Sequence, residues 1–214
     1  MKNNSEKIKS IRLLDAVLLG SFFLSGCCAL IYQVGWQRSL YGIIGMDIDS
    51  ITIIVSVFML GIGFGGMLGG RIADKAPRQR IQCYAAAEVS IALYGFSSLA
   101  LLQSIGDWLT VTGGSALWSG LASFLFLIVP TILMGITLPL LTMAFNEWKQ
   151  SIGVSVGQLY FFNTLGAATG AGLVPFVLLP HWSLDQVIHL AALGNILVAA
   201  AAIFSYARQV ALKK

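Results

Sequence analysis

Long apolar runs, separated by short polar stretches, dominate the hydrophobic pattern of the chain. A helix needs about 20 residues to cross the hydrocarbon core of a bilayer, and the runs reach this length without the strict alternation of membrane β-strands. Ser183 and Gln186 form a capping-box pattern at the start of the last run. The pattern predicts an all-α, polytopic membrane protein with six transmembrane helices, at residues 14–36, 50–70, 81–103, 117–142, 156–179 and 185–206.

The composition supports a chain that lies mostly within a bilayer. Apolar residues make up 57% and charged residues 10% of its 214 residues, whereas a water-soluble domain carries about 25% charged residues. The mean hydropathy is +0.83. These values exclude a disordered chain, a secreted disulfide scaffold and an ordinary cytosolic enzyme.

The placement of the basic residues predicts the orientation of the chain. With six spans, both termini and the second and fourth loops share one side, which holds all of the thirteen Lys and Arg residues except Arg38. Because cytoplasmic loops are enriched in basic residues, both termini are expected to be cytoplasmic. The predicted domains are a cytoplasmic N-terminal segment at 1–13, a transmembrane domain at 14–207 and a cytoplasmic tail at 208–214.

The first apolar run has a second interpretation. Leu24-Ser25-Gly26-Cys27 follows a basic start and an apolar run, as in the cleavage box of a lipoprotein signal. Cleavage would remove half of the first span and place Asp15 inside the apolar part of the signal, so the six-span interpretation is preferred. Cys27, Cys28 and Cys83 have neither metal-ligand spacing nor a disulfide framework, and we interpret them as buried thiols.

The second apolar run ends in a glycine-rich segment. Gly61, Gly65 and Gly69 are four residues apart and therefore lie on one helix face, as Gly66 and Gly70 do. Small residues at this spacing allow two helix backbones to approach closely in lipid. The approach is either a contact within the chain or a contact between two copies of it.

The loop after this segment resembles the loop between the second and third helices of the major facilitator superfamily. The resemblance rests on the pattern G-x-x-x-D-K-x-P-R-x-R, in which Pro77 replaces the glycine usual in the family. It implies a charge relay that holds one conformation of a transporter, with Asp74 in an ionic network. The matching residues, which form the predicted conformational motif, are Gly70, Asp74, Lys75, Arg78 and Arg80.

Further motifs resemble the membrane part of bacterial fused major-facilitator/spermidine-synthase proteins. Glu88 and Tyr94 fit the third helix of that family, whereas Gln33 stands where its first helix is expected to carry a glutamate. The motifs in the other helices are Ser25-Gly26 followed by Ala29-Leu30, Tyr32, Trp36 and Arg38; Pro130-Thr131-x-x-Met134-Gly135-x-Thr137-Leu138-Pro139; and Gly157-x-Leu159-Tyr160-x-x-Asn163-Thr164-Leu165-Gly166-Ala167.

This resemblance implies a half-size, major-facilitator-like bundle with a 3+3 inverted repeat, located in the bacterial cytoplasmic (inner) membrane. The family usually carries a cytoplasmic aminopropyltransferase-like domain after its membrane part. Because the chain stops at Lys214, the expectation at this stage is a membrane part without that soluble synthase domain.

Polar residues within the spans are the candidate substrate-binding or ion-binding residues, because each is costly to place in a bilayer. Glu88 is the only carboxylate well inside a predicted span. It either binds a cation or proton, or pairs structurally with a tyrosine, a loop arginine or a helix end. The other candidates on the first and fifth helices are Tyr32, Gln33, Trp36, Tyr160 and Asn163.

Two functions remain open. No arrangement of nucleophile, base or metal ligands indicates catalysis, so neither an enzyme nor a cofactor, metal or nucleic-acid partner is expected. The first function is a half-size transporter of a small metabolite or amine that acts as a dimer. The second is a non-transporting membrane module that anchors or scaffolds a separate partner, such as a spermidine-synthase-like protein. Both predict contact with lipid and either a homodimer or a hetero-complex.

Overall fold

The computed structural model of the protein is helical throughout most of the residues that it describes, 2–44, 48–113 and 115–213. Six segments of this described part are long and apolar enough to cross a membrane. The prediction of six long apolar helices is therefore confirmed. The elements are α1 (Lys2–Ile44), α2 (Ile48–Lys75), the 3-10 turn η1 (Pro77–Gln79), α3 (Arg80–Val111), α4 (Ala116–Lys149), α5 (Ile152–Leu173), the π-helical turn η2 (Val174–Leu178), α6 (Leu179–His181) and α7 (Leu184–Lys213).

Several helices extend beyond the predicted spans. Hydropathy marks only the part of a helix that fits hydrocarbon, whereas polar residues at the helix ends continue the backbone hydrogen bonds. Arg38 consequently lies within α1, and the stretch between the predicted spans 81–103 and 117–142 contracts to the few residues between α3 and α4. The stretch between the predicted spans 14–36 and 50–70 includes residues 45–47, which lie outside the described residues.

The start of α7 has the predicted capping box. The backbone N–H of Ser183 donates to Gln186 Oε1 at 3.0 Å, and the backbone N–H of Gln186 donates to Ser183 Oγ at 3.3 Å. Two N–H groups that the helix leaves unpaired at its first turn are satisfied in this way.

The helix α1 runs without interruption through the possible lipoprotein cleavage box. Cys27 and Cys28 are buried, Cys83 is half-buried, and all three are free thiols. The two adjacent cysteines thus contribute to the packing of α1, as the sequence predicts, whereas Cys83 is less enclosed than expected.

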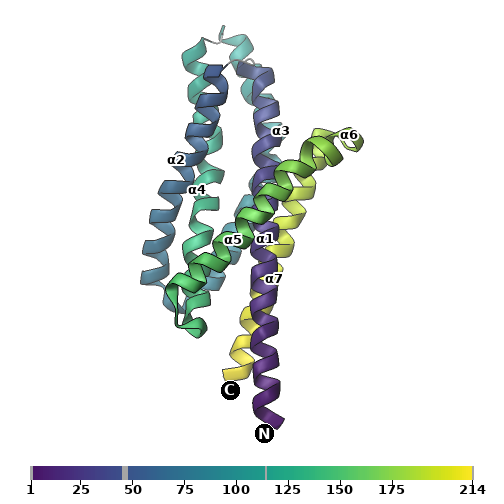
Figure 1. Cartoon of the computed structure of the whole chain (residues 1–214). Coiled ribbons are helices and arrows are strands. Elements are labelled where there is room, and N and C mark those ends of the chain that lie inside the picture. The colour runs from purple at the N-terminus through teal and green to yellow at the C-terminus, as the bar shows by residue number, and fades with distance from the viewer. Residues whose placement is uncertain (1, 45–47, 114, 214) are drawn as a thin grey trace.

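The helices form two groups that α5 connects (Figure 1). The helix α2 packs along α4, and α3 packs along α7, while α5 crosses α1 obliquely. Both termini lie at the same end of the bundle as the turn between α2 and α3 and the turn between α4 and α5 (Figure 1). The segments with most of the basic residues therefore meet at one end.

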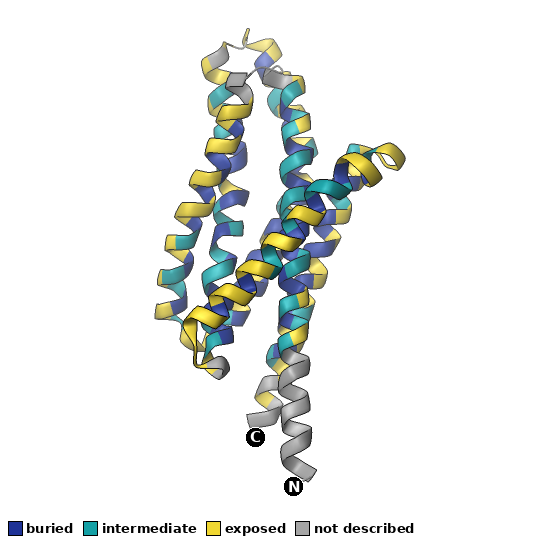
Figure 2. Ribbon diagram, in the orientation of Figure 1, coloured by how far each residue is buried: buried dark blue, intermediate teal, exposed yellow. Residues whose placement is uncertain are grey.

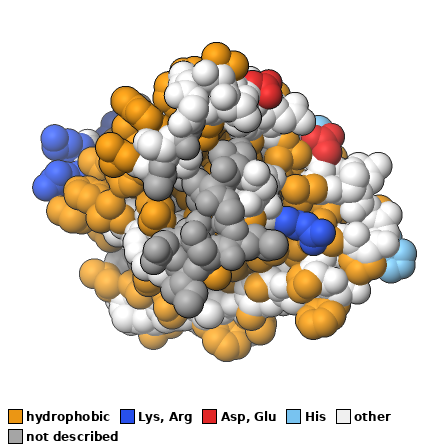
Figure 3. All heavy atoms as spheres, turned by 90° about the horizontal axis from the view of Figure 1, so that it is seen from above, with side chains coloured by type: hydrophobic (Ala, Val, Ile, Leu, Met, Phe, Trp, Pro, Cys, Tyr) orange, Lys and Arg blue, Asp and Glu red, His pale blue; other side chains and the backbone are white. Residues whose placement is uncertain are grey.

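The outside of the bundle is apolar. Exposed positions follow the outward faces of the helices and buried ones follow the contacts between them (Figure 2). On α2, Met59, Phe64 and Met67 are each more than half exposed. Seen from the end opposite the termini, hydrophobic side chains surround the bundle and charged ones are few (Figure 3). Such a surface is stable against lipid rather than against water.

The glycine face of α2 is used within the chain. A Cβ atom added at Gly61 would meet the Thr131 side chain, and one added at Gly65 or Gly69 would meet the backbone of α4 at Ile132 or Ile136. The backbones of α2 and α4 therefore approach as closely as small residues allow. Of the two contacts that the sequence left open, the structure shows the one within the chain for Gly61, Gly65 and Gly69, whereas a Cβ atom added at Gly66 or Gly70 meets nothing within 4 Å.

Candidate functional site

A polar layer separates two apolar clusters in the core. One cluster contains Trp36 and the other contains Phe145. The layer consists of one polar residue from each of the three helices that cross the centre, and each lies along its helix between members of the two clusters. These residues are Ser25 on α1, Glu88 on α3 and Asn195 on α7.

Glu88 is the centre of this layer. Its side chain is fully buried, with an exposed fraction of 0%. Ser25 Oγ donates a hydrogen bond to Glu88 Oε1 at 2.7 Å, and Asn195 Nδ2 donates to Glu88 Oε2 at 2.5 Å. Among the residues that the structure describes, no Lys or Arg forms an ion pair with this carboxyl group. The buried Tyr84 hydroxyl group also lies beside Glu88. Of the structural partners predicted for Glu88, a tyrosine is therefore nearby, whereas a loop arginine is not observed.

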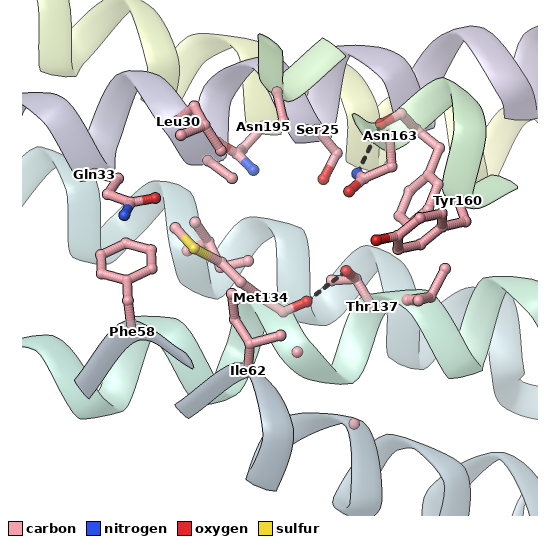
Figure 4. A pocket seen from close by; sticks show the side chains of 18 of the residues that line it. Ser25, Leu30, Gln33, Phe58, Ile62, Met134, Thr137, Tyr160, Asn163 and Asn195 are labelled. Carbon is pink, nitrogen blue, oxygen red and sulfur yellow. Dashed lines mark hydrogen bonds between the residues drawn. The ribbon is translucent and has the colours of Figure 1, made fainter. Parts of the chain in front are cut away.

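A cavity of about 310 Å³ adjoins the polar layer. The helices α1, α2, α4 and α5 provide most of its lining (Figure 4). Ser25 and Asn195 also belong to its wall, so the Glu88 carboxyl group lies one hydrogen bond behind the cavity surface. A volume of this size is at the lower end for a site that binds a small molecule, about 300–1,000 Å³.

Three of the predicted site residues line this cavity: Gln33, Tyr160 and Asn163. Asn163 Nδ2 donates to the backbone oxygen of Phe22 at 3.1 Å, which leaves its side-chain oxygen directed into the cavity (Figure 4). The Tyr160 hydroxyl group lies near this oxygen, whereas Gln33 lies toward the opposite end (Figure 4). The cavity is therefore apolar along its length and has polar groups near both ends.

Tyr32 and Trp36 do not line the cavity, contrary to the grouping that their positions beside Gln33 predicted. Both are fully buried, and their rings stack with centroids 4.8 Å apart. Trp36 Nε1 donates a hydrogen bond at 2.9 Å to Oγ of Ser98, which belongs to α3. Neighbouring residues on a helix face different directions, and these two face α3 rather than the cavity.

The conformational motif has a different ionic contact from the predicted one. Asp74 is exposed, and no ion pair joins it to another described residue. Arg80 instead pairs with Glu147 on α4 at 3.1 Å, and it donates to the backbone oxygens of Ala73 and Met143. Gly70, Lys75 and Arg78 make no such contact among the described residues. The observed interaction therefore joins α2, α3 and α4 through Arg80.

This contact predicts a difference between two loop arginines. Arg80→Gln should lower the free energy of unfolding by about 1–3 kcal/mol, because it removes hydrogen bonds to a carboxylate and to two carbonyl groups. The exposed Arg78 is the matched control, and Arg78→Gln should change it by less than about 0.5 kcal/mol. Unfolding of both purified variants in mixed detergent micelles measures the difference. Equal stability of the two variants would contradict the role given to Arg80.

Two residues of the site were not among the predicted candidates. Ser25 was noted only as part of a motif, and Asn195 was not singled out. Asn195 did carry a usable signal, because it is an amide inside a strongly apolar span, where polar groups need partners. Ser25 carried none, since a serine in a membrane helix can bond its own backbone.

The fold and the cavity define a bundle of six long apolar helices with a polar site at its centre. Two relatives of known name match this chain. Polyamine aminopropyltransferase 2 of Streptomyces coelicolor is 28% identical over 169 residues, which cover 77% of this chain and 29% of the relative. The polyamine aminopropyltransferase of Oceanobacillus iheyensis is 25% identical over 203 residues, which cover 94% of this chain and 38% of the relative.

These comparisons confirm the resemblance to spermidine-synthase-like proteins in its coarser form, as a distant similarity over most of the chain. The chain spans about a third of the length of the curated relatives that it matches. No protein-family model matches it, and no solved structure does.

The prediction that the chain has no enzymatic role is wrong. It rested on the lack of a catalytic arrangement of residues within the sequence. Both relatives are named as enzymes, and each matches this chain over three quarters of its length or more. A lack of catalytic motifs in a sequence does not by itself show that a protein has no enzymatic role, which is why this reasoning failed.

Proposed function

We propose that the chain forms the membrane-embedded part of a polyamine aminopropyltransferase, with both termini in the bacterial cytoplasm. The similarity of the whole bundle to two proteins of that name carries the proposal. The apolar outer surface and the six long helices support its place in the cytoplasmic membrane. The gathering of basic segments at one end supports the orientation.

The helix contacts support a major-facilitator-like inverted repeat within this part. Exchanging the first three spans with the last three replaces α1 with α4, α2 with α5, and α3 with α7. This exchange converts the contact of α2 with α4 into that of α5 with α1, and the contact of α1 with α7 into that of α4 with α3. These four contacts and the contact between α3 and α7 are the most extensive ones between helices. The exchange leaves the contact between α3 and α7 unchanged. An internal two-fold axis in the membrane plane has this property.

In this proposal the cavity binds a small amine or related metabolite for the aminopropyltransferase. Its apolar length suits a chain of methylene groups, and Gln33, Tyr160 and Asn163 offer polar contacts at its ends. The transferase activity itself comes from the same protein or from an associated one.

Affinity capture tests the proposal. The tagged chain is isolated from gently solubilised membranes of its own organism. It is then assayed for conversion of isotope-labelled 1,4-diaminobutane into its aminopropyl adduct, measured by mass spectrometry. The captured material should form the adduct, and material from an untagged strain should not. Folded, captured chain without any aminopropyl transfer, from a cell extract that has this activity, would overturn the proposal.

Transport of the amine is the second candidate function. It is favoured by the inverted-repeat contacts and by a cavity that lies between the helices of both halves. In the major facilitator fold the substrate path lies between two six-helix bundles, so a transporter needs a second bundle from another copy or another protein. Vesicles that contain the purified chain should then accumulate labelled 1,4-diaminobutane. If the vesicles take up no diamine although aminopropyl transfer is present, only the first proposed function remains supported.

A further inference from the structure

We propose that Ser25, Glu88 and Asn195 form a binding site for the ammonium group of a linear primary amine that lies in the cavity. The proposal rests on the proposed function in one respect, the binding of a small amine, and it adds the site and the charge of the ligand. It is testable on the purified chain without any aminopropyltransferase activity.

The first argument is the complete burial of Glu88 without a described cationic partner. A fully buried carboxylate is costly unless a cation pairs with it. The two observed partners, Ser25 and Asn195, are neutral donors, and no described Lys or Arg pairs with Glu88. A cationic ligand at the adjoining cavity wall would supply the missing positive charge.

The second argument is an unused acceptor atom. Asn195 is 2% exposed, and its Oδ1 atom has no hydrogen-bond partner among the described residues. Its Nδ2 group already donates a hydrogen bond to Glu88. A buried carbonyl oxygen without a partner is costly, and Asn195 belongs to the cavity wall (Figure 4). A ligand with N–H groups would satisfy this oxygen.

The third argument is the number of acceptor positions. An ionised carboxylate has about four lone-pair positions; Ser25 and Asn195 occupy one on each oxygen of Glu88, and the Tyr84 hydroxyl group lies beside the same carboxyl group. An ammonium group carries three N–H donors and no acceptor. At the cavity wall, the Ser25 hydroxyl oxygen and Asn195 Oδ1 are acceptors for such donors, and the Glu88 carboxyl group lies one hydrogen bond behind them. A hydroxyl group, with one donor and no charge, would leave most of these acceptors unsatisfied.

The rest of the ligand follows from the cavity. Between the polar layer and its far wall the lining is mostly apolar, with Phe58, Ile62 and Met134 on one side (Figure 4). An unbranched alkyl chain fits such a lining. The side-chain oxygen of Gln33, which lies toward the end of the cavity opposite Asn163, can accept a hydrogen bond from a second amine group at the end of that chain. The site thus fits a diamine better than a monoamine.

Ligand binding to the purified chain in nanodiscs tests the site. Calorimetry with 1,4-diaminobutane should show binding, and 1,4-butanediol, which has the same length without charge, should show none at the same concentrations. Glu88→Gln should weaken binding of the diamine by about tenfold or more, the effect of losing a charge-assisted hydrogen bond. Glu147→Gln is the matched control, since it removes a carboxylate outside the cavity and should leave the affinity unchanged.

A measurement on the unaltered protein covers the case in which Glu88→Gln does not fold. A photoreactive alkyl diamine that carries a diazirine should label residues of α1, α3 and α7 close to the polar layer, as mapped by peptide mass spectrometry. Excess 1,4-diaminobutane should suppress this labelling and 1,4-butanediol should not. The proposal is overturned by equal binding of the diol, by a folded Glu88→Gln protein with unchanged affinity, or by labelling confined to residues away from the cavity. Loss of aminopropyl transfer alone would bear only on the proposed function.

Discussion

Trp36→Ala is expected to lower the free energy of unfolding by about 3–5 kcal/mol, the range for removing a large buried aromatic side chain. Trp36 is fully buried and stacks on Tyr32, and its ring meets those of Tyr94 and Phe126 edge-on. Its indole N–H also donates to the buried hydroxyl group of Ser98. The alanine variant leaves a cavity between α1, α3 and α4, and the Ser98 hydroxyl group keeps only its hydrogen bond to the backbone oxygen of Gly95.

Denaturation in mixed micelles measures this effect against a matched control. Trp118 is 49% exposed, and Trp118→Ala should cost less than about 1 kcal/mol. Trp36→Phe keeps part of the packing and loses the hydrogen bond to Ser98, so its stability should lie between those of the wild type and Trp36→Ala. If the two alanine variants proved equally stable, the aromatic cluster would not be the centre of the fold.

Gly65→Leu is expected to prevent α2 from packing on α4, at a cost of at least about 3 kcal/mol, the upper end of the range for overpacking. An added Cβ atom at Gly65 would lie 2.8 Å from Gly135 Cα and would also contact the Ile132 oxygen. Both neighbours belong to the backbone of α4, so no side chain can move aside to accept the leucine.

Gly63→Leu provides the control, because no atom lies within 4 Å of a Cβ added at Gly63. Both substitutions bring the same gain in helix propensity, so the difference between them isolates the contact with α4. The fraction of protein that remains monodisperse after solubilisation, and its resistance to denaturant, should fall for Gly65→Leu only. Equal yields of folded protein would show that α2 and α4 do not depend on close contact.

The number of helices was predictable from the sequence because a span leaves a local signal, an apolar run of sufficient length. The capping box at Ser183 and Gln186 was predictable for the same reason, since both partners lie within one turn. The choice between the two uses of the α2 glycines was not predictable. That choice depends on Gly135 and its neighbours on α4, which are distant in the sequence and carry no signal for their partner.

The candidate site was predictable only in part, for a related reason. Glu88 stood out because a carboxylate inside a span is costly. Its partners Ser25 and Asn195 are 63 and 107 residues away in the chain, so their meeting depends on helix packing. Similarly, the motif predicted an ionic contact for Asp74, whereas Glu147, the partner of Arg80, lies outside that motif.

The most direct test of the proposed function is the polyamine content of cells that lack this chain. Deletion of its gene in the source organism should lower the pool of aminopropylated amines, measured by mass spectrometry with isotope-labelled 1,4-diaminobutane as precursor. A plasmid copy of the chain should restore the pool, whereas a copy with Gly65→Leu should not. An unchanged pool of aminopropylated amines and an unchanged rate of label incorporation in the deletion strain would contradict the account.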